Sequence, residues 1–165
     1  MLASLARRRR LEGAPRALRT EAANAAGKLL LETGDVDGIR TTAALVEKLG
    51  GSAFNGVDVE AVIGEKTAAA DARQDRLTTE LSNHKTNLIK ESIRMGYNDL
   101  GDFYYDRNDL SAALKSYVRT RDYCTTAKHV VAMSLAVVRL SLEVENWNQV
   151  LTYVAKASST LDEID

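Results

Sequence analysis

Apolar residues recur at helical spacing through the second half of the chain. From residue 89 they stand four, four, three and four positions apart, which places them on one face of an α-helix. They are Ile89, Ile93, Tyr97, Leu100 and Tyr104. Polar residues 106–109 follow, and Asn108 or Asp109 can cap a next helix. That helix carries Leu110, Ala113, Leu114, Tyr117 and Val118. The pattern predicts a helical hairpin over about residues 84–122.

A second hairpin is predicted over about residues 126–160. Its first helix has two apolar stripes, one through Val130, Met133, Val137 and Leu140, the other through Val131, Leu135, Val138 and Leu142. A helix that is apolar on two sides is expected to pack between neighbours on both sides. After a turn at Glu145-Asn146, the second helix bears Trp147, Val150, Leu151, Val154 and Leu161. We expect the two hairpins to stack side by side without any β-strand.

The first half of the chain is less strongly patterned. Proline and glycine frame two helices, one beginning near Pro15 and another ending at Gly50-Gly51. Residues 58–82 form a polar helical pattern with only Leu77 and Leu81 as large apolar anchors. Eight of the nine aromatic residues lie from Tyr97 onward, so the well-packed core is expected there. The predicted division is into looser N-terminal helices (1–56), a polar connecting helix (57–83) and helical hairpins (84–165).

The first predicted hairpin carries the pattern of a tetratricopeptide repeat, which is Trp-x2-Leu-Gly-x2-Tyr, then Ala, then an aromatic residue. The matching positions are Tyr97, Leu100, Gly101, Tyr104, Ala113 and Tyr117. The small residues Gly101 and Ala113 are predicted to face each other where the two helices approach most closely, with the rings filling the groove. Thr125 stands where the repeat has proline. A shift of 37 residues overlays the apolar pattern of the second hairpin on the first, although Val138 replaces the glycine.

These patterns predict an all-α fold, a right-handed stack of antiparallel helical hairpins in a tetratricopeptide-like α-solenoid. A generic helical bundle is the alternative. The single proline and the 5% of aromatic residues argue against a β-sandwich or barrel. No apolar run approaches the roughly 18 residues that span a bilayer, so no membrane protein is expected.

Charge is unevenly distributed along the 165 residues. The chain has a net charge of −1, but six arginines against one acid give the first 20 residues a charge of +5. The run Arg7, Arg8, Arg9 and Arg10 could belong to a transit peptide, to a solvated helix face, or to a phosphate-binding or nuclear-import patch. Because the remainder is acidic and the aromatics sit at core spacing, nucleic acid is not the expected partner.

The sequence contains no recognisable set of catalytic residues. Walker, Gly-x-Gly-x-x-Gly, Gly-x-Ser-x-Gly and His-Glu-x-x-His motifs are all absent from the sequence. Cys124 lies near Arg119, Arg121 and Lys128, which could lower the pKa of its thiol, although a packed residue at a hairpin corner is the simpler interpretation. His84 and His129 have no ligand partner at metal-binding spacing. We therefore expect no catalytic residue, no metal, no cofactor and no small-molecule substrate.

Three segments resemble subunit 1 of the COP-nine signalosome. They are NLIKESIRMGYNDLGD (87–102), YVRTRDYCTTAKH (117–129), and Asn146-Trp147 with VLTYVAKA (150–157). The likeness is dense from His84 to Ala157 and is greatest to the plant and algal members. A weaker likeness at Ala14 to Ala22 suggests that the N-terminal segment belongs to the family's first helices, and residues 35–80 are similar only in pattern.

The resemblance implies a non-catalytic scaffold subunit of the complex that removes the ubiquitin-like modifier NEDD from cullins and so regulates cullin-RING ubiquitin ligases. The implied partners are the other signalosome subunits and, through the complex, those ligases, in the nucleus and cytoplasm. The metalloprotease of that complex is a different subunit. Family members continue into a winged-helix assembly module shared with proteasome-lid subunits. Because this sequence stops at Asp165, we expect a fragment, a truncated gene product or an incomplete gene model.

Two alternatives to the signalosome subunit remain. One is the homologous proteasome-lid subunit, against which the segment from Arg119 to His129 argues. The other is a free-standing tetratricopeptide adaptor, whose inward-facing cluster of basic and amide side chains is suggested here only by Lys90 and Arg94.

The last predicted helix carries a candidate docking strip, made of Trp147, Val150, Leu151 and Val154. A repeat array buries each hairpin against the next, so one side of a terminal helix stays open. In a complete family member the chain's own continuation would cover this strip. In the isolated chain we expect it to be exposed and to cause self-association or poor solubility.

Overall fold

The computed structural model describes residues 13–162, and within that range it contains helices and no strand. The elements are α2 (Arg16–Leu30), α3 (Val36–Lys48), the short 3-10 helix η1 (Ala53–Asn55), α4 (Val59–Thr86), α5 (Lys90–Asp106), α6 (Leu110–Thr120), the 3-10 helix η2 (Arg121–Tyr123), α7 (Ala127–Glu143) and α8 (Trp147–Asp162). The predicted all-α class is confirmed. The Arg7–Arg10 run lies outside the described residues. None of the helices described is both long enough and apolar enough to cross a bilayer.

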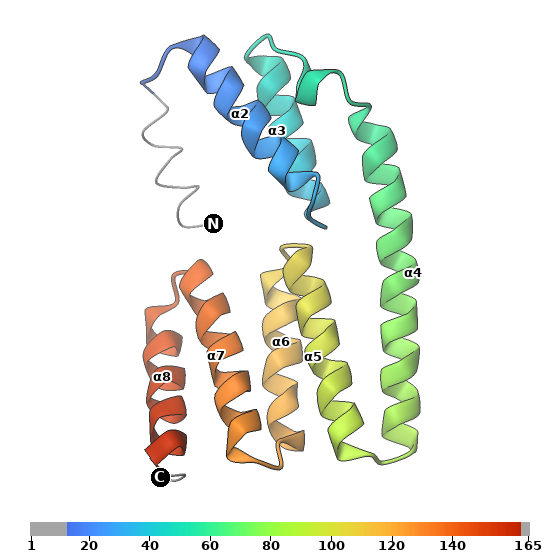
Figure 1. The fold of residues 1–165 in the computed structure, drawn as a ribbon, viewed down its shortest axis with the longest axis vertical. Coiled ribbons are helices and arrows are strands. Elements are labelled where there is room, and N and C mark those ends of the chain that lie inside the picture. The colour runs from blue at the N-terminus through green and yellow to red at the C-terminus, as the bar shows by residue number, and fades with distance from the viewer. Residues whose placement is uncertain (1–12, 163–165) are drawn as a thin grey trace. The chain divides into compact units, whose positions relative to one another are not determined.

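The chain divides into two compact units, residues 1–72 and residues 73–165, with the division inside α4. In the first unit, α2 lies beside α3 (Figure 1). Its core is built from buried Ile39, Ala43, Ala53, Phe54 and Ile63. Ile39 and Val46 are completely buried, so this unit has a core of its own. That its helices are looser than those of the second unit stays a prediction.

Phe54 anchors this first core through an uncommon backbone conformation. Its φ is 49°, in the left-handed region that residues other than glycine rarely adopt. The backbone N–H of Phe54 donates to the side-chain oxygen of Asn24 on α2 at 2.7 Å, and the ring packs directly on Gly27, where any side chain would overlap it. One aromatic residue in a turn therefore joins the loop to α2. Apolar periodicity cannot reveal this, since Phe54 belongs to no helical stripe.

In the second unit, the end of α4 and helices α5, α6, α7 and α8 lie side by side in chain order (Figure 1). Leu81 on α4 packs with Ile93 and Leu100 on α5. A second buried cluster joins α6 to α7 and contains Ala113, Tyr117, Met133, Val137 and Leu140. The two apolar anchors predicted in the polar helix, Leu77 and Leu81, thus contact α5.

The two apolar stripes of α7 differ in burial. Met133, Val137 and Leu140 of the first stripe are buried, whereas Leu135 of the second is 56% exposed. As expected, α7 packs between α6 and α8, but Leu135 of its second stripe is left uncovered by the described helices.

The turn between α5 and α6 reverses the chain within three residues. The N–H of Asp109 donates to the carbonyl of Tyr104 at 2.9 Å, and the N–H of Asn108 donates to that of Tyr105 at 2.9 Å. With Asn108 at a φ of 61°, this is a Schellman motif, which satisfies the last carbonyls of α5. The Asp109 carboxylate then accepts from the N–H of Ala112 at 3.0 Å and caps α6.

The same turn returns 37 residues later, between α7 and α8. The N–H groups of Asn146 and Glu145 donate to the carbonyls of Ser141 and Leu142 at 2.9 and 3.3 Å. The Asn146 side chain accepts from the N–H of Gln149 at 3.2 Å. Glu145 takes the left-handed position with a φ of 58°. The 37-residue shift seen in the sequence therefore relates two turns of the same design.

Replacing Glu145 with glycine is expected to stabilise the second unit. An L-residue in the left-handed region is strained, whereas glycine adopts it freely, so Glu145→Gly should raise the free energy of unfolding by about 0.5–1 kcal/mol. Asn108→Gly is the matched control and should gain less, since asparagine tolerates this conformation. Urea denaturation followed by Trp147 fluorescence measures both. A Glu145→Gly variant no more stable than its parent would contradict this account of the turn.

Candidate functional site

The six residues of the repeat motif divide between two buried clusters. Leu100 and Tyr97 pack in the α4–α5 cluster, and Ala113 and Tyr117 pack in the α6–α7 cluster. Tyr104 contacts both clusters, and Gly101 lies against Tyr117. Leu100, Gly101, Ala113 and Tyr117 are buried, and Tyr97 and Tyr104 are half-buried. A side chain at Gly101 would overlap the ring of Tyr117, which fills the space that the glycine leaves open. Ala113 is completely buried, and its position opposite Gly101 stays a prediction. At this point α5 and α6 are thus packed through the Tyr117 ring of α6, which lies against the backbone of Gly101 on α5.

Tyrosine hydroxyls connect this packing to polar groups. The Tyr117 hydroxyl donates to the Asp102 carboxylate on α5. Burial, and then the hydrogen bond to Asp102, raise the pKa of Tyr117 far above its ordinary value near 10. The Tyr97 ring stacks on Tyr123 with centroids 5.8 Å apart, and the ammonium of Lys85 lies 4.8 Å from the Tyr97 centroid.

A second set of polar contacts links α5 directly to α7. The Tyr105 hydroxyl donates to the Glu143 carboxylate and accepts from Nε of Arg139 at 3.0 Å. The Arg139 guanidinium also lies 4.0 Å from the centre of the Tyr105 ring. Burial and the Glu143 carboxylate raise the pKa of Tyr105. These contacts join the C-terminal ends of α5 and α7.

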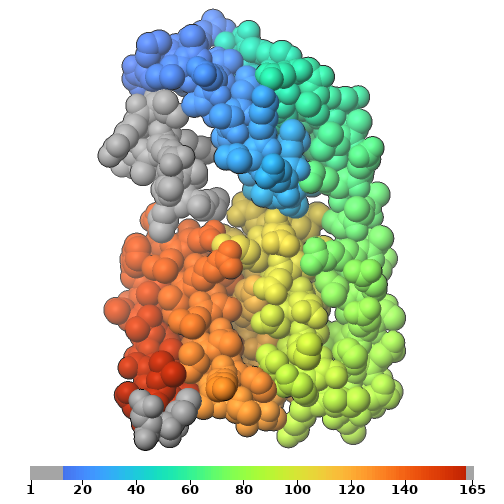
Figure 2. Space-filling model, viewed as in Figure 1, coloured from blue at the N-terminus to red at the C-terminus, as the bar shows by residue number. Residues whose placement is uncertain are grey.

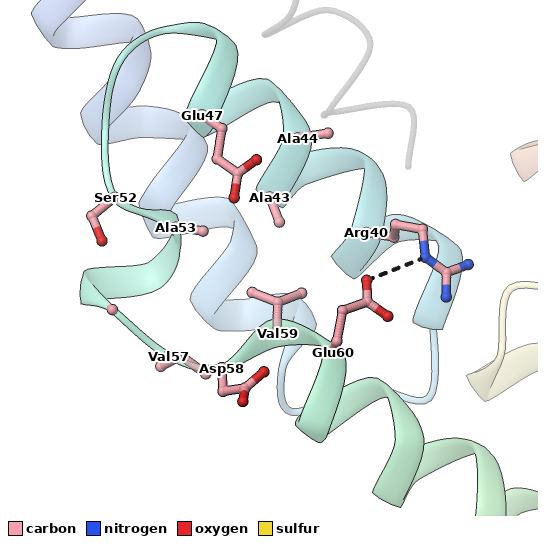
Figure 3. A pocket seen from close by; sticks show the side chains of 11 residues that line it. Arg40, Ala43, Ala44, Glu47, Ser52, Ala53, Val57, Asp58, Val59 and Glu60 are labelled. Carbon is pink, nitrogen blue, oxygen red and sulfur yellow. Dashed lines mark ion pairs between the residues drawn. The ribbon is translucent and has the colours of Figure 1, made fainter.

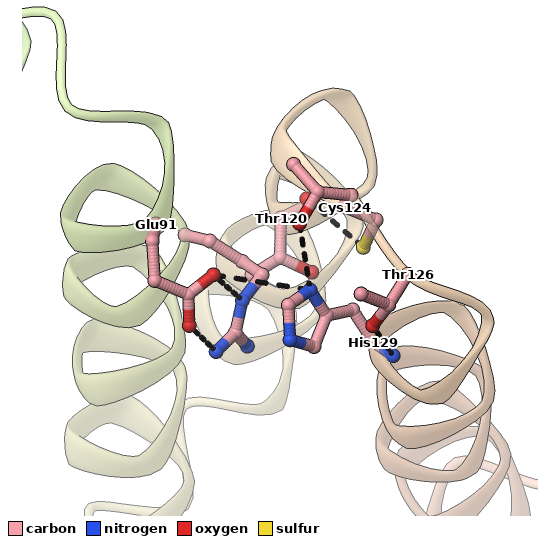
Figure 4. Close-up of polar contacts among 7 residues, drawn as sticks. Glu91, Thr120, Cys124, Thr126 and His129 are labelled. Carbon is pink, nitrogen blue, oxygen red and sulfur yellow. Dashed lines mark hydrogen bonds and ion pairs between the residues drawn. The ribbon is translucent and has the colours of Figure 1, made fainter.

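The N-terminal ends of α5 and α7 meet at a polar corner (Figure 4). Nε of Arg94 donates to the Glu91 carboxylate at 3.0 Å, and a second guanidinium nitrogen donates to its other oxygen. Nδ1 of His129 lies 3.8 Å from the same carboxylate. The hydrogen bond from Arg94 lowers the pKa of Glu91. The Thr126 hydroxyl caps α7 by accepting from the N–H of His129 at 3.3 Å.

Cys124 at this corner is not an activated nucleophile. Its thiol donates to the Thr120 carbonyl at 3.3 Å (Figure 4), and burial raises its pKa although Arg94 acts in the opposite sense. A nucleophilic cysteine needs a lowered pKa. The packed-corner interpretation of Cys124 therefore fits better than a reactive one. Among the residues described, no three histidine, cysteine or carboxylate side chains group as metal ligands.

The first unit has a hollow of about 410 Å³ between α3, the η1 turn and the start of α4 (Figure 3). Ala43, Ala53 and Val59 supply apolar lining, and Glu47 and Asp58 contribute carboxylates. Nε of Arg40 lies 3.8 Å from the Glu60 carboxylate, as an exposed ion pair. Asp58 already accepts from the N–H of Ala61 at 3.1 Å as a helix cap. The hollow thus holds structural polar contacts and no nucleophile paired with a base.

The candidate docking strip lies on α8, which runs along one edge of the second unit in red (Figure 2). Trp147, Leu151 and Val154 are 55%, 68% and 47% exposed, while Val150 is half-buried. Leu161, two turns beyond Val154, is also half exposed. Large apolar side chains gathered on one helix face are typical of a protein contact surface.

Substituting Gly101 with leucine is expected to disrupt the hairpin. Any side chain at Gly101 overlaps the Tyr117 ring, so Gly101→Leu should lower the free energy of unfolding by about 1–3 kcal/mol. Gly64→Leu is the control, because Gly64 on α4 has open space around it and should tolerate the change. Chemical denaturation followed by far-UV circular dichroism compares them. Equal losses in the two variants would show that the crossing is not tightly packed.

Stability of the second unit is expected to fall at high pH. The folded pKa of Tyr117 is raised, so the stabilisation from its neutral hydroxyl is complete below the unfolded value near 10 and is lost as pH rises above it. Tyr117→Phe should be less stable at pH 7 by about 0.5–1.5 kcal/mol because the Asp102 hydrogen bond is gone, and its stability should fall less between pH 10 and 11.5. Urea titrations across this range test the expectation. Parallel pH curves for parent and variant would contradict it.

Comparison with known proteins supports the resemblance seen in the sequence. Residues 60–165 match the family described as 26S proteasome subunit RPN7. The chain is 48% identical over 96 residues to COP9 signalosome complex subunit 1 of Arabidopsis thaliana, covering 58% of the chain and 22% of the relative. It is 47% identical over 100 residues to COP9 signalosome complex subunit 1b of Drosophila melanogaster, covering 61% and 19%. The subunit 1 of Emericella nidulans is 43% identical over 88 residues, covering 53% and 18%.

The predicted likeness to signalosome subunit 1 is thereby confirmed. The aligned stretches amount to about a fifth of the length of these relatives. The family match contains all of the second unit, including the repeat motif, the polar corner and the α8 strip. Because it covers more than half of the 165 residues, the chain belongs to the RPN7 family of proteasome-lid and signalosome subunits.

Proposed function

We propose that the chain acts as a non-catalytic scaffold segment of a signalosome-type complex that removes NEDD from cullins and regulates cullin-RING ubiquitin ligases. The observation that carries the proposal is the 43–48% identity to signalosome subunit 1 from a plant, an insect and a fungus. The partners proposed are the other signalosome subunits and, through them, cullin-RING ligases. The proposed location is the nucleus and cytoplasm.

The arrangement of the second unit supports a scaffold role. The matching turns between α5 and α6 and between α7 and α8, 37 residues apart, support the proposal of a tetratricopeptide-like α-solenoid. Two tyrosines with raised pKa values donate to carboxylates on other helices, Tyr117 to Asp102 and Tyr105 to Glu143. Such contacts fix the spacing of helices, and a fixed spacing is what a subunit-binding surface needs.

A subunit of the proteasome lid is the second candidate. The match of residues 60–165 to the RPN7 family favours it, since that family is described by a proteasome subunit. The relatives named above are signalosome subunits, and for that reason the signalosome is preferred. A free-standing peptide-binding adaptor has less support, because Arg94 is held by Glu91 and is not available as part of a basic cluster.

A chimaera can distinguish the two complexes. The 96-residue segment matched in the Arabidopsis signalosome subunit would be replaced by the corresponding residues of this chain, and the same exchange would be made in an RPN7 subunit. We expect the signalosome chimaera to assemble and to support removal of NEDD from cullin at near-parental rate, and the lid chimaera to assemble poorly. Size-exclusion chromatography and a cullin gel-shift assay measure the outcome. The reverse pattern would assign the chain to the lid.

The purified chain alone is expected to leave NEDD-modified cullin intact. In the signalosome family that the chain resembles, the proteolytic activity belongs to a different subunit, which is a metalloprotease. Incubating the chain with modified cullin, with and without a chelator, tests this. Cleavage that the chelator abolishes would contradict a non-catalytic role.

A further inference from the structure

The turn between α4 and α5 has the same backbone hydrogen bonds as the two later turns of the second unit. The N–H of Leu88 donates to the carbonyl of Lys85 at 3.2 Å. The N–H of Ile89 donates to the carbonyl of His84 at 3.4 Å. Leu88 takes the left-handed position with a φ of 57°, so the three turns share one Schellman design. Their equivalent residue pairs are Leu88-Ile89, Asn108-Asp109 and Glu145-Asn146.

Leucine and isoleucine are unfavourable at the two positions that they occupy in this turn. Asparagine tolerates the left-handed region, whereas a bulky apolar residue there is strained. The second position is the N-cap of the next helix, where Asp109 and Asn146 each accept a backbone hydrogen bond. Ile89 has no side-chain oxygen, and α5 consequently begins without a side-chain cap. Polar residues at both positions would therefore favour the same turn.

Burial within the chain does not explain the apolar pair. An apolar residue at the Ile89 position often contacts the preceding helix, but Ile89 is 50% exposed, and Leu88 is 81% exposed. A single exposed leucine needs no explanation. Two adjacent exposed apolar side chains at positions that favour polar residues break a local rule without a gain in packing, which is characteristic of a functional site. The pair has the properties of an anchor for a binding partner.

The surface around this pair is basic. The α4–α5 turn and the α6–α7 connection lie at the same end of the second unit (Figures 1 and 4). Within residues 81–94 and 119–129 the acids are Glu91 and Asp122, and each is held in an ion pair by a neighbouring arginine. Four exposed basic residues of these two segments make no ion pair within the described part of the chain, namely Lys85, Lys90, Arg119 and Lys128.

We propose that the Leu88-Ile89 turn and the basic residues around it form a docking surface for an acidic segment of another protein. The apolar pair receives an aliphatic or aromatic side chain of that segment, and the carboxylates of the segment lie beside the unpaired lysines and arginine. Charge complementarity selects this partner, because the same basic residues repel a basic segment. The proposal rests on the scaffold role proposed above and does not depend on which complex supplies the partner.

Nucleic acid is the competing partner for a basic surface. Phosphate contacts come from lysine and arginine and need no exposed aliphatic side chain. Two exposed aliphatic residues beside Lys85 and Lys90 therefore favour a protein segment.

Copying the α5–α6 turn separates binding from folding. Leu88→Asn/Ile89→Asp reproduces the Asn108-Asp109 pair, and its midpoint of urea unfolding is expected to equal or exceed that of the parent, because both positions then hold favoured residues. Val144→Asn is the control, since Val144 is 48% exposed and lies at the opposite end of α7 from this surface. A clearly lower midpoint for the double variant alone would show that the apolar pair serves folding, and would overturn the proposal.

A defined peptide tests the docking surface on the purified chain. The probe is a fluorescein-labelled peptide with a central leucine pair between runs of glutamate, and fluorescence anisotropy measures its dissociation constant. We expect a value of about 10–100 µM, as for a small contact, and an increase of at least about tenfold for Leu88→Asn/Ile89→Asp. Lys90→Glu should also weaken binding. Val144→Asn and Lys115→Glu, which changes an exposed residue in the middle of α6, should bind as the parent does.

Two control peptides separate the apolar and the electrostatic contributions. Serine in place of the leucine pair removes the apolar contact, and lysine in place of glutamate reverses the charge, so both peptides should bind at least about tenfold more weakly. Four results would overturn the proposal. They are no binding of the probe at about 1 mM, equal binding of the serine peptide, equal losses in the double variant and Val144→Asn, and a single-stranded oligonucleotide that displaces the probe at a lower concentration than unlabelled peptide does.

A photo-cross-linker identifies the partner within a complex. In whichever chimaera described above assembles, p-benzoylphenylalanine replaces Leu88, and in a parallel control it replaces Thr79, which is exposed on α4. We expect position 88 alone to cross-link to an acidic segment of a neighbouring subunit. A cross-link within the same subunit, or to a segment without carboxylates, would contradict the proposal. If neither chimaera assembles, the proposed function fails, and the peptide measurement still decides the docking surface.

Discussion

The chain reversal between α5 and α6 is the constraint on which the second unit depends. Three residues between the helices must satisfy the last carbonyls of one and the first N–H groups of the other, and the Schellman motif with the Asp109 cap does both. A reversal this short brings the two helices into close antiparallel contact. Gly101 then becomes necessary, because the Tyr117 ring occupies the space in which a side chain would lie.

The second hairpin has an equally short turn, but different side chains lie behind it. The turn at Glu145 and Asn146 repeats the hydrogen bonds of the first turn. Val138 replaces the glycine, and Val154 stands where the first hairpin has Tyr117. Val138 is half-buried and Val154 is 47% exposed, so the contact of a ring with a glycine is not repeated in the second hairpin. The two turns match, while the side chains behind them differ.

Sequence patterning was sufficient for the helices of the second unit, the turn residues and the 37-residue shift, since all three follow from local spacing and capping. It was insufficient where a side chain makes its main contacts outside the apolar face of its own helix. The Tyr117 ring was expected in a groove and lies on Gly101, and Phe54 was left outside every predicted helix although it fills the first core. Leu135 was expected to be buried because periodicity reports which face is apolar and not whether a neighbour covers it. The exposure of α8 was predicted from repeat architecture and not from periodicity, because the outermost helix of a repeat array has one face without a neighbouring repeat.

The raised pKa values of Tyr117 and Tyr105 follow from burial and from hydrogen bonds to carboxylates. A catalytic group needs a pKa near the operating pH and an open site for a reacting atom. Tyr117 and Tyr105 are shifted away from neutrality, and each hydroxyl is engaged by a carboxylate on a neighbouring helix. Removing either hydroxyl would leave the Asp102 or Glu143 carboxylate without its tyrosine partner. The two tyrosines therefore link α5 to α6 and to α7 by hydrogen bonds as well as by packing.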